Sequence, residues 1–216
     1  MIVKICGITR TEDALVAAGA GADAIGFVFW PSSPRFIDPY RALAIAAAMP
    51  PFVTLVGVFV NQTPAYMNGV ASLVGLGAVQ LHGDETPEVL DQLRRPAIRA
   101  VSIDAGVGDV TRGWKEDDWP DRVVLLADVR DPVNRGGTGR LVDWGAAGLL
   151  ASRRRVLLAG GLTPENVMAA IGQVRPFGVD VSSGVERSPG IKDPARVRAF
   201  IAEAVSYTHL TLPTKA

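Results

Sequence analysis

The sequence MIVKICGITRTEDALVAAGAGADAIGFVF, residues 1–29, carries the pattern that decides the fold. Its two apolar runs, 2–6 and 24–29, are rich in Ile, Val and Phe, as strands buried on both faces are. The Ala-rich segment 12–20 between them predicts a helix, for which Thr11 is the expected N-cap. The stretch therefore predicts a strand–helix–strand unit with two parallel strands.

The same alternation continues along the chain. Most of the predicted helices begin with a capping residue followed by Pro, which loses only an N–H that lacks a partner in any helix. These starts are Asp38-Pro39, Thr63-Pro64, Thr86-Pro87, Thr163-Pro164 and Asp193-Pro194, and Asp143 precedes a further helix. Strands are predicted at 2–6, 24–29, 53–60, 78–81, 97–102, 123–128, 156–160 and 178–182. Helices are predicted at 12–20, 39–48, 65–74, 88–94, 144–151, 165–172 and 195–205, with a weaker signal over 104–117.

Eight strand–helix units predict a single (β/α)8 TIM barrel over residues 1–205, with eight parallel strands and the helices outside. A doubly wound open sheet is the competing architecture, but its GxGxxG fingerprint is absent after the first strand. The last segment, 206–216, reads SYTHLTLPTKA and continues neither pattern. We expect a disordered tail there, and its composition resembles a non-native extension of the reading frame.

Composition excludes several classes of protein. The 216 residues carry 22 Lys and Arg against 22 Asp and Glu, whereas a nucleic-acid-binding protein has a basic excess. No run of about 18 apolar residues predicts a membrane span. We expect no signal peptide, because no charged region with a long apolar stretch precedes the first strand. The single cysteine rules out an intrachain disulfide and suits a reducing compartment, so we expect a cytoplasmic protein without membrane or nucleic-acid partners.

Candidate catalytic residues stand where strands end, because the reacting side chains of such barrels gather at that mouth. Cys6 ends the first predicted strand, and a nearby cation such as Lys4 can lower a thiol pKa enough to make it a base. Asp128 ends the very apolar run 123–128, where partial burial suits a general acid. Each residue also has a purely structural interpretation. Cys6 could be a small buried side chain, Lys4 a lysine with its hydrogen bonds satisfied inside the barrel, and Asp128 an aspartate that only binds loop amides.

Two glycine- and serine-rich turns predict a phosphate site. They follow the seventh and eighth strands, the position at which barrels commonly bind phosphate through backbone amides. The residues are Gly160, Gly161, Ser182, Ser183 and Gly184. A third Gly-rich stretch, 134–139, follows the sixth strand and is interpreted as an active-site loop.

Two further polar residues are candidates for substrate binding. Arg35 lies in the loop after the second strand, where its guanidinium can bind a substrate carboxylate. His82 ends the fourth strand, and a structural histidine is the alternative. With one cysteine and two histidines in the chain, we expect no metal site.

Taken together, these segments resemble the phosphoribosylanthranilate isomerase family of tryptophan biosynthesis. The resemblance runs in order over residues 1–205. It is carried by Lys4-Ile5-Cys6-Gly7-Ile8-Thr9, Gly26-Phe27-Val28-Phe29 with Ser33-Pro34-Arg35, Gly57-Val58-Phe59-Val60, Gln80-Leu81-His82-Gly83, Gly136-Gly137-Thr138-Gly139, Gly160-Gly161-Leu162 and Val179-Asp180-Val181-Ser182-Ser183-Gly184-Val185-Glu186.

The resemblance implies an Amadori rearrangement of N-(5-phosphoribosyl)anthranilate without metal or cofactor. It implies that Asp128 protonates the ring oxygen and that Cys6 removes the C2 proton, although Asp131 is close enough in sequence to be an alternative acid. Arg35 would bind the anthranilate carboxylate, with His82 lining that end. Asp180 would contact sugar hydroxyls, and the two Gly/Ser loops would hold the phosphate. Lys4, next to Cys6 on the first strand, is a further candidate for substrate binding.

Three other functions compete with this one. Indole-glycerol-phosphate synthase would need a catalytic lysine and glutamates at strand ends. An aminosugar-phosphate isomerase of histidine synthesis would need a carboxylate where Cys6 stands. A barrel that only binds phosphate would be expected to lack Cys6 or Asp128, and both are present. The sequence is compatible with a monomer or a homodimer.

Overall fold

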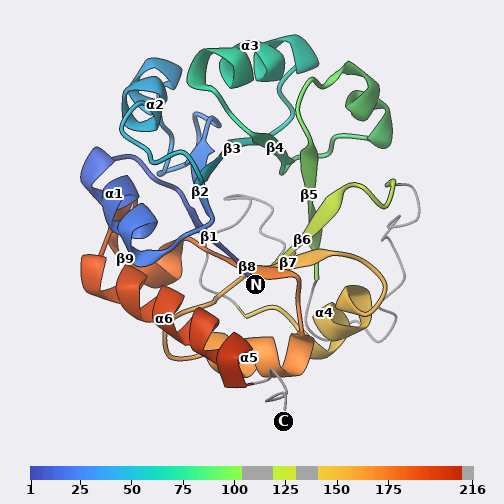
Figure 1. The fold of residues 1–216 in the computed structure, drawn as a ribbon. Coiled ribbons are helices and arrows are strands. Elements are labelled where there is room, and N and C mark those ends of the chain that lie inside the picture. Colours follow the sequence, from blue (N-terminus) through green and yellow to red (C-terminus); the bar gives the residue numbers. More distant parts are fainter. Residues whose placement is uncertain (104–118, 130–140, 211–216) are drawn as a thin grey trace.

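The computed structural model describes residues 1–103, 119–129 and 141–210, and in the last four of these only the backbone. Eight parallel strands form one closed barrel in the order β1 to β8. Figure 1 looks along the barrel axis and shows the helices as an outer ring around the strands. The predicted (β/α)8 fold is confirmed.

Each strand lies within two residues of its predicted bounds at either end. The strands are β1 (Ile2–Cys6), β2 (Ala24–Val28), β3 (Thr54–Phe59), β4 (Ala78–Leu81), β5 (Ala97–Ser102), β6 (Val124–Asp128), β7 (Val156–Leu158) and β8 (Gly178–Val181). The barrel closes where β1 pairs with β8, which puts Lys4 opposite Asp180.

Alternate residues of each strand face opposite sides of the barrel wall, as the twofold period of a strand requires. Val3 and Ile5 of β1 belong to the large apolar core between the strands and the helices. Cys6 instead packs with Val28 and Val58, residues of the next two strands, in a small group inside the barrel. The interior therefore receives Cys6 and, two residues earlier on the same side, Lys4.

The helices largely follow their predicted starts. Asp38, Thr63 and Asp143 each accept a hydrogen bond from a backbone N–H in the first turn of α2, α3 and α4. Asp193 does the same for Ala195 and Arg196. The bounds are α1 (Thr11–Ala20), α2 (Pro39–Ala46), α3 (Pro64–Val74), α4 (Trp144–Ala151), α5 (Val167–Val174) and α6 (Pro194–Leu210).

Several local predictions were wrong. Thr11 is the first residue of α1 rather than its cap. The segment predicted as a helix at 88–94 is a single 3-10 turn, η1 (Pro87–Gln92), and Thr86 makes no capping hydrogen bond. The helix expected at 165–172 begins two residues later, after Asn166. The helix signal over 104–117 falls outside the described residues.

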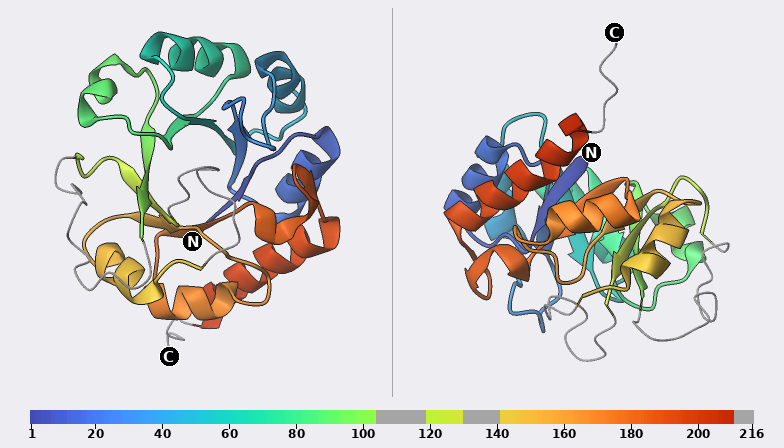
Figure 2. Two further views of the ribbon diagram at one scale, coloured as in Figure 1. Left: turned by 180° about the vertical axis from the view of Figure 1, so that it is seen from behind. Right: turned by 90° about the horizontal axis from the view of Figure 1, so that it is seen from below.

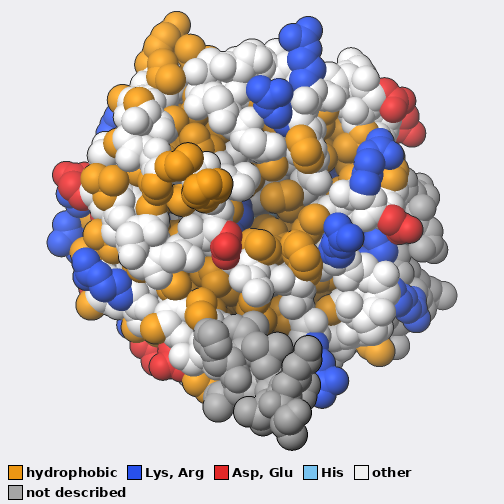
Figure 3. All heavy atoms as spheres, viewed as in Figure 1, with side chains coloured by type: hydrophobic (Ala, Val, Ile, Leu, Met, Phe, Trp, Pro, Cys, Tyr) orange, Lys and Arg blue, Asp and Glu red, His pale blue; other side chains and the backbone are white. Residues whose placement is uncertain are grey.

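The last helix extends further than its predicted end at 205. α6 continues to Leu210 and packs against α1 and α5, as the side view in Figure 2 shows. Residues 211–216 of the expected tail fall outside the described part of the chain. Among the described residues, no helix is long and apolar enough to cross a membrane. On the face shown in Figure 3, charged and hydrophobic side chains are interspersed.

A hairpin between β8 and α6 was not predicted from the sequence. It begins with the short 3-10 turn η3 (Ser183–Val185), followed by the antiparallel strands β9 (Glu186–Ser188) and β10 (Ile191–Lys192). The backbone N–H of Lys192 donates to Asp13 Oδ2 of α1 at 3.0 Å, which ties the hairpin to the first helix. The hairpin thereby places two charged side chains, Glu186 and Lys192, beside the mouth of the barrel.

Candidate active site

Cys6, Lys4 and Asp180 meet inside the barrel at the β1–β8 seam. Lys4 Nζ donates to Asp180 Oδ1 at 2.8 Å, and both residues are buried. The pairing of the two strands puts these residues side by side, so the contact follows from the barrel's closure. Asp180, which the resemblance assigns to sugar hydroxyls, is thus also the partner of a buried cation.

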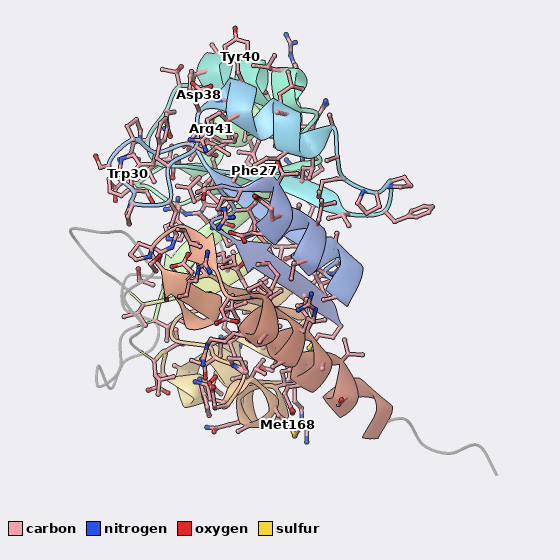
Figure 4. The ribbon with its side chains drawn as sticks, turned by 90° about the vertical axis from the view of Figure 1, so that its left-hand side faces the viewer. Phe27, Trp30, Asp38, Tyr40, Arg41 and Met168 are labelled. Atoms are coloured by element: carbon pink, nitrogen blue, oxygen red, sulfur yellow. The ribbon has the colours of Figure 1, made fainter. Side chains whose placement is uncertain are left out.

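Gly26 of β2 makes room for the thiol. It pairs with Cys6 in the parallel ladder. A β-carbon at Gly26 would lie 2.7 Å from Cys6 Sγ, closer than such atoms approach, and 3.2 Å from Lys4 Nζ, a tight contact. Trp30, labelled in Figure 4 beyond the end of β2, packs against the same small group as Cys6.

The cations near Cys6 oppose the effect of burial on the pKa of its thiol. Burial raises the pKa of the Cys6 thiol, and the Lys4 and Lys192 cations lower it only in part, so the net pKa lies above its ordinary value. Burial also lowers the pKa of Lys4, but attraction to Asp180 and Cys6 outweighs this and raises it overall. Lys4 therefore remains a cation next to the thiol, as the sequence suggested, without making the thiol acidic.

Asp128 ends β6 with its carboxyl partly buried. Its Oδ1 accepts from the Val129 backbone N–H at 2.8 Å, and the side chain is 15% exposed. Burial is the main cause that raises the pKa of Asp128 to about 6, with the Val129 hydrogen bond opposing it and the charge of Asp180 adding to it. A carboxyl with this pKa holds a proton far more readily near neutral pH than an exposed aspartate.

His82 faces Asp128. The distance from His82 Nε2 to Asp128 Oδ2 is 3.7 Å. On the other side of the ring, the Gln80 amide nitrogen lies 2.9 Å from Nδ1. With the Gln80 amide in this orientation its NH2 donates to Nδ1, so a neutral ring carries its hydrogen on Nε2, toward the acid. The resemblance placed His82 at the carboxylate-binding end, and the structure places it beside the candidate acid.

The two predicted phosphate loops contact each other closely. A β-carbon on Gly184 would lie 1.8 Å from the Leu162 carbonyl oxygen, so only glycine allows this approach. Gly160 and Gly161 both have φ of +69°, a conformation that favours glycine. A β-carbon on Gly160 would lie 3.0 Å from Asp128 Oδ1, so this glycine also borders the candidate acid.

Arg35 lies at the mouth, and its partner was not anticipated. Its Nε and Nη2 donate to the two carboxylate oxygens of Glu186 at 2.9 and 2.8 Å. Lys192 Nζ donates to Glu186 Oε1 at 2.8 Å and lies within reach of Ser182. In the sequence, Glu186 was noted only as the last residue of the matching segment 179–186. No local sequence pattern indicated a role for Lys192.

The structure thus brings the sequence-predicted residues to one end of the barrel, from six different strands or the loops after them. Asp131 and the Gly136–Gly139 loop fall outside the described residues. Within the described ranges, no three His, Cys, Asp or Glu side chains lie together as a metal site would require.

Comparison with known proteins identifies the family. A family model described as N-(5'phosphoribosyl)anthranilate (PRA) isomerase matches residues 3–203. The N-(5'-phosphoribosyl)anthranilate isomerase of Geobacter sulfurreducens is 48% identical over 203 residues, which are 94% of this chain and 97% of that protein.

Two solved structures agree with this match. Phosphoribosyl anthranilate isomerase from Thermotoga maritima has a TM-score of 0.85 at 45% identity, covering 95% of this chain and 100% of that one. A phosphoribosyl anthranilate isomerase in complex with reduced 1-(o-carboxyphenylamino)-1-deoxyribulose 5-phosphate has a TM-score of 0.82 at 44% identity, with the same coverage. The chain belongs to the phosphoribosylanthranilate isomerase family.

Proposed function

We propose that the protein converts N-(5-phosphoribosyl)anthranilate to 1-(2-carboxyphenylamino)-1-deoxyribulose 5-phosphate, an aldose–ketose isomerisation of tryptophan biosynthesis. Family membership supports the overall reaction. The observation that carries the residue roles is the pairing of a buried thiol at the end of β1 with a carboxyl whose pKa is about 6 at the end of β6. We place the reaction in the cytoplasm, in keeping with the single free cysteine.

Asp128 is the general acid. Its proton passes to the ring oxygen of the phosphoribosyl group, the bond from C1 to that oxygen breaks, and the nitrogen lone pair forms the C1=N bond of a Schiff base. The raised pKa supports this role, because the proton must be present near neutral pH. His82 Nε2, facing Asp128 Oδ2, stabilises the carboxylate that remains.

Cys6 is the general base. Its thiolate removes the C2 proton, the electron pair of that bond forms C1=C2, and the C1=N electrons return to nitrogen. The resulting enolamine takes a proton at C1 and loses one from its C2 hydroxyl, which gives the ketone. Lys4 stabilises the thiolate because it is a cation held next to it by Asp180.

The two ends of the substrate carry negative charge. We assign the phosphate to the paired loops of Gly160, Gly161, Ser182, Ser183 and Gly184, which contact each other closely and have backbone amides suited to binding an anion. We assign the anthranilate carboxylate to Arg35, which lies at the mouth on the loop after β2. Fixing both ends would hold C2 near the thiol for proton transfer.

The test is a fluorescence assay of phosphoribosylanthranilate turnover with the Cys6→Ser and Asp128→Asn variants. General acid–base groups contribute roughly 10²–10⁴-fold, and each variant should lose a factor in this range. Asp121→Asn is the matched control, because Asp121 is 99% exposed and pairs only loosely with Arg154. Absence of turnover by the unmodified protein would refute the activity, and a full rate in Cys6→Ser would refute the base.

A further inference from the structure

Glu186 and Lys192 form an ion cluster with Arg35, and these two residues have no role in the mechanism above. Glu186 is its centre, with a side chain only 4% exposed, and Arg35 and Lys192 contact it from two sides. Arg35 and Glu186 are 151 residues apart in the sequence and come from opposite sides of β1 in the barrel order. Such a contact links the loop after β2 to the loop after β8.

The geometry of the pair uses one edge of the guanidinium. Glu186 accepts from Nε and Nη2, which form the side edge of the fork. An arginine side chain has five N–H donors, so three remain. Within the described part of the chain they have no partner, and two of them, on Nη1 and Nη2, point in parallel from the end edge. That edge matches a second carboxylate in a two-bond arrangement.

The charges of the cluster also favour a further anion. Burial raises the pKa of Glu186, but its hydrogen bonds to Arg35 and the Lys192 charge outweigh this, so its pKa lies below the ordinary value. Glu186 is therefore ionised. Arg35 is a permanent cation, and Lys192 adds a second positive charge when it is protonated, although burial lowers its pKa against the attraction of Glu186. A mostly buried group with an unbalanced positive charge gains from a bound anion, because charges removed from water must be paired.

The arm of Arg35 is fixed next to the chemistry. A β-carbon on Gly7 would lie 2.6 Å from Arg35 Cδ and 2.8 Å from Ser182 Oγ, so the arm lies directly against the residue after Cys6. The guanidinium could swing about this arm if nothing held it. The Glu186 carboxylate restricts that motion, and Lys192 in turn fixes Glu186.

We propose that Glu186 is a positioning residue that holds the side edge of Arg35, so that the end edge is presented to the aromatic carboxylate of the substrate. The inference rests on the proposed function and deepens it. Glu186 does not touch the substrate, and it sets specificity for a carboxylated aglycone through Arg35. A purely structural role, in which the pair only anchors the hairpin, predicts an effect that is independent of that carboxylate.

The experiment compares two ligands by isothermal titration calorimetry. One is reduced 1-(o-carboxyphenylamino)-1-deoxyribulose 5-phosphate, and the other is the same compound without the carboxyl group. In Glu186→Gln, the Kd for the carboxylated ligand should rise about 10-fold or more, the value of one hydrogen bond between charged groups. The Kd for the ligand without a carboxyl group should change by less than about twofold.

Two further variants complete the design. Arg187→Gln changes a charge at an exposed position of the same strand and should leave both Kd values unchanged. Glu186→Asp keeps the carboxylate on a shorter arm and should restore part of the preference for the carboxylated ligand. Far-UV circular dichroism checks the fold of each variant independently, so that weaker binding of both ligands by a folded protein indicates a purely structural role.

The outcomes separate the two proposals. If the unmodified protein binds the carboxylated ligand and Glu186→Gln weakens both ligands equally, the positioning role is wrong while the proposed function stands. An unchanged Kd for the carboxylated ligand in Glu186→Gln also overturns it. If the unmodified protein binds neither ligand and does not turn over phosphoribosylanthranilate, the proposed function itself fails.

Discussion

At the scale of single residues, burial raises the pKa of both Asp128 and Cys6, with opposite consequences. For the acid the shift is useful, because it retains the proton. For the base it is a cost, because it lowers the fraction of thiolate. Catalysis needs Asp128 protonated and Cys6 ionised at once, which is the reverse of their most populated states at neutral pH.

This reversal predicts the pH profile of kcat/KM. Between the pKa of Asp128, about 6, and the higher pKa of Cys6, the active fraction is constant, because each rise in pH removes acid as fast as it adds thiolate. Below about pH 6 Asp128 is already protonated, and the rate should fall about tenfold per pH unit as thiolate is lost. Steady-state assays across the pH range measure this.

The Asp128→Asn variant tests whether the change of slope in kcat/KM near pH 6 is due to the titration of Asp128. Its small residual rate should rise continuously with pH until the pKa of Cys6 is reached, with no break near pH 6. A break that persists in this variant would belong to another group, such as the substrate phosphate, and would contradict the assignment.

At the scale of elements, the strands could be predicted because burial on both faces leaves a continuous apolar run. Helix starts were less certain. The side chains of Asp38 and Thr63 cap the helices that follow them. Thr86 and Thr163 also precede Pro, but no side-chain capping hydrogen bond is present at either of those starts. Pro fixes only one dihedral angle, and packing decides whether the next turns become an α-helix. The β9–β10 hairpin has too few residues to show a period.

Glycines in two elements make a matched pair of tests. Gly26→Ala puts a β-carbon 2.7 Å from Cys6 Sγ, so the thiol must rotate away and kcat should fall. Gly69→Ala in α3 meets nothing within 4 Å and should raise the free energy of unfolding by about 0.5–1 kcal/mol. Urea melts and turnover assays measure both. A full rate in Gly26→Ala would show that the thiol's position there is not critical.

At the scale of the whole molecule, the closed barrel creates contacts that no local pattern encodes. Arg35 with Glu186, and His82 with Asp128, join loops and strands far apart in sequence. The strand-end rule predicted that Cys6, Asp128 and Arg35 share one mouth, because parallel strands all end there. It could not predict which charged groups pair, since that depends on loop paths and side-chain directions.

The C-terminal helix provides the last prediction, on where the fold ends. Phe200, Ile201 and Ala204 of α6 are buried in the core, whereas Val205 and Ser206 are exposed. A chain that stops at Ser206 keeps those buried contacts, so its Tm should fall by less than about 4 °C, the effect of roughly 1 kcal/mol. Phe200→Ala removes a buried ring worth about 3–5 kcal/mol and should lower the Tm by about 10 °C. Scanning calorimetry compares the two Tm values. If the shortened chain lost as much Tm as Phe200→Ala, the residues after Ser206 would contribute substantially to the stability of the barrel.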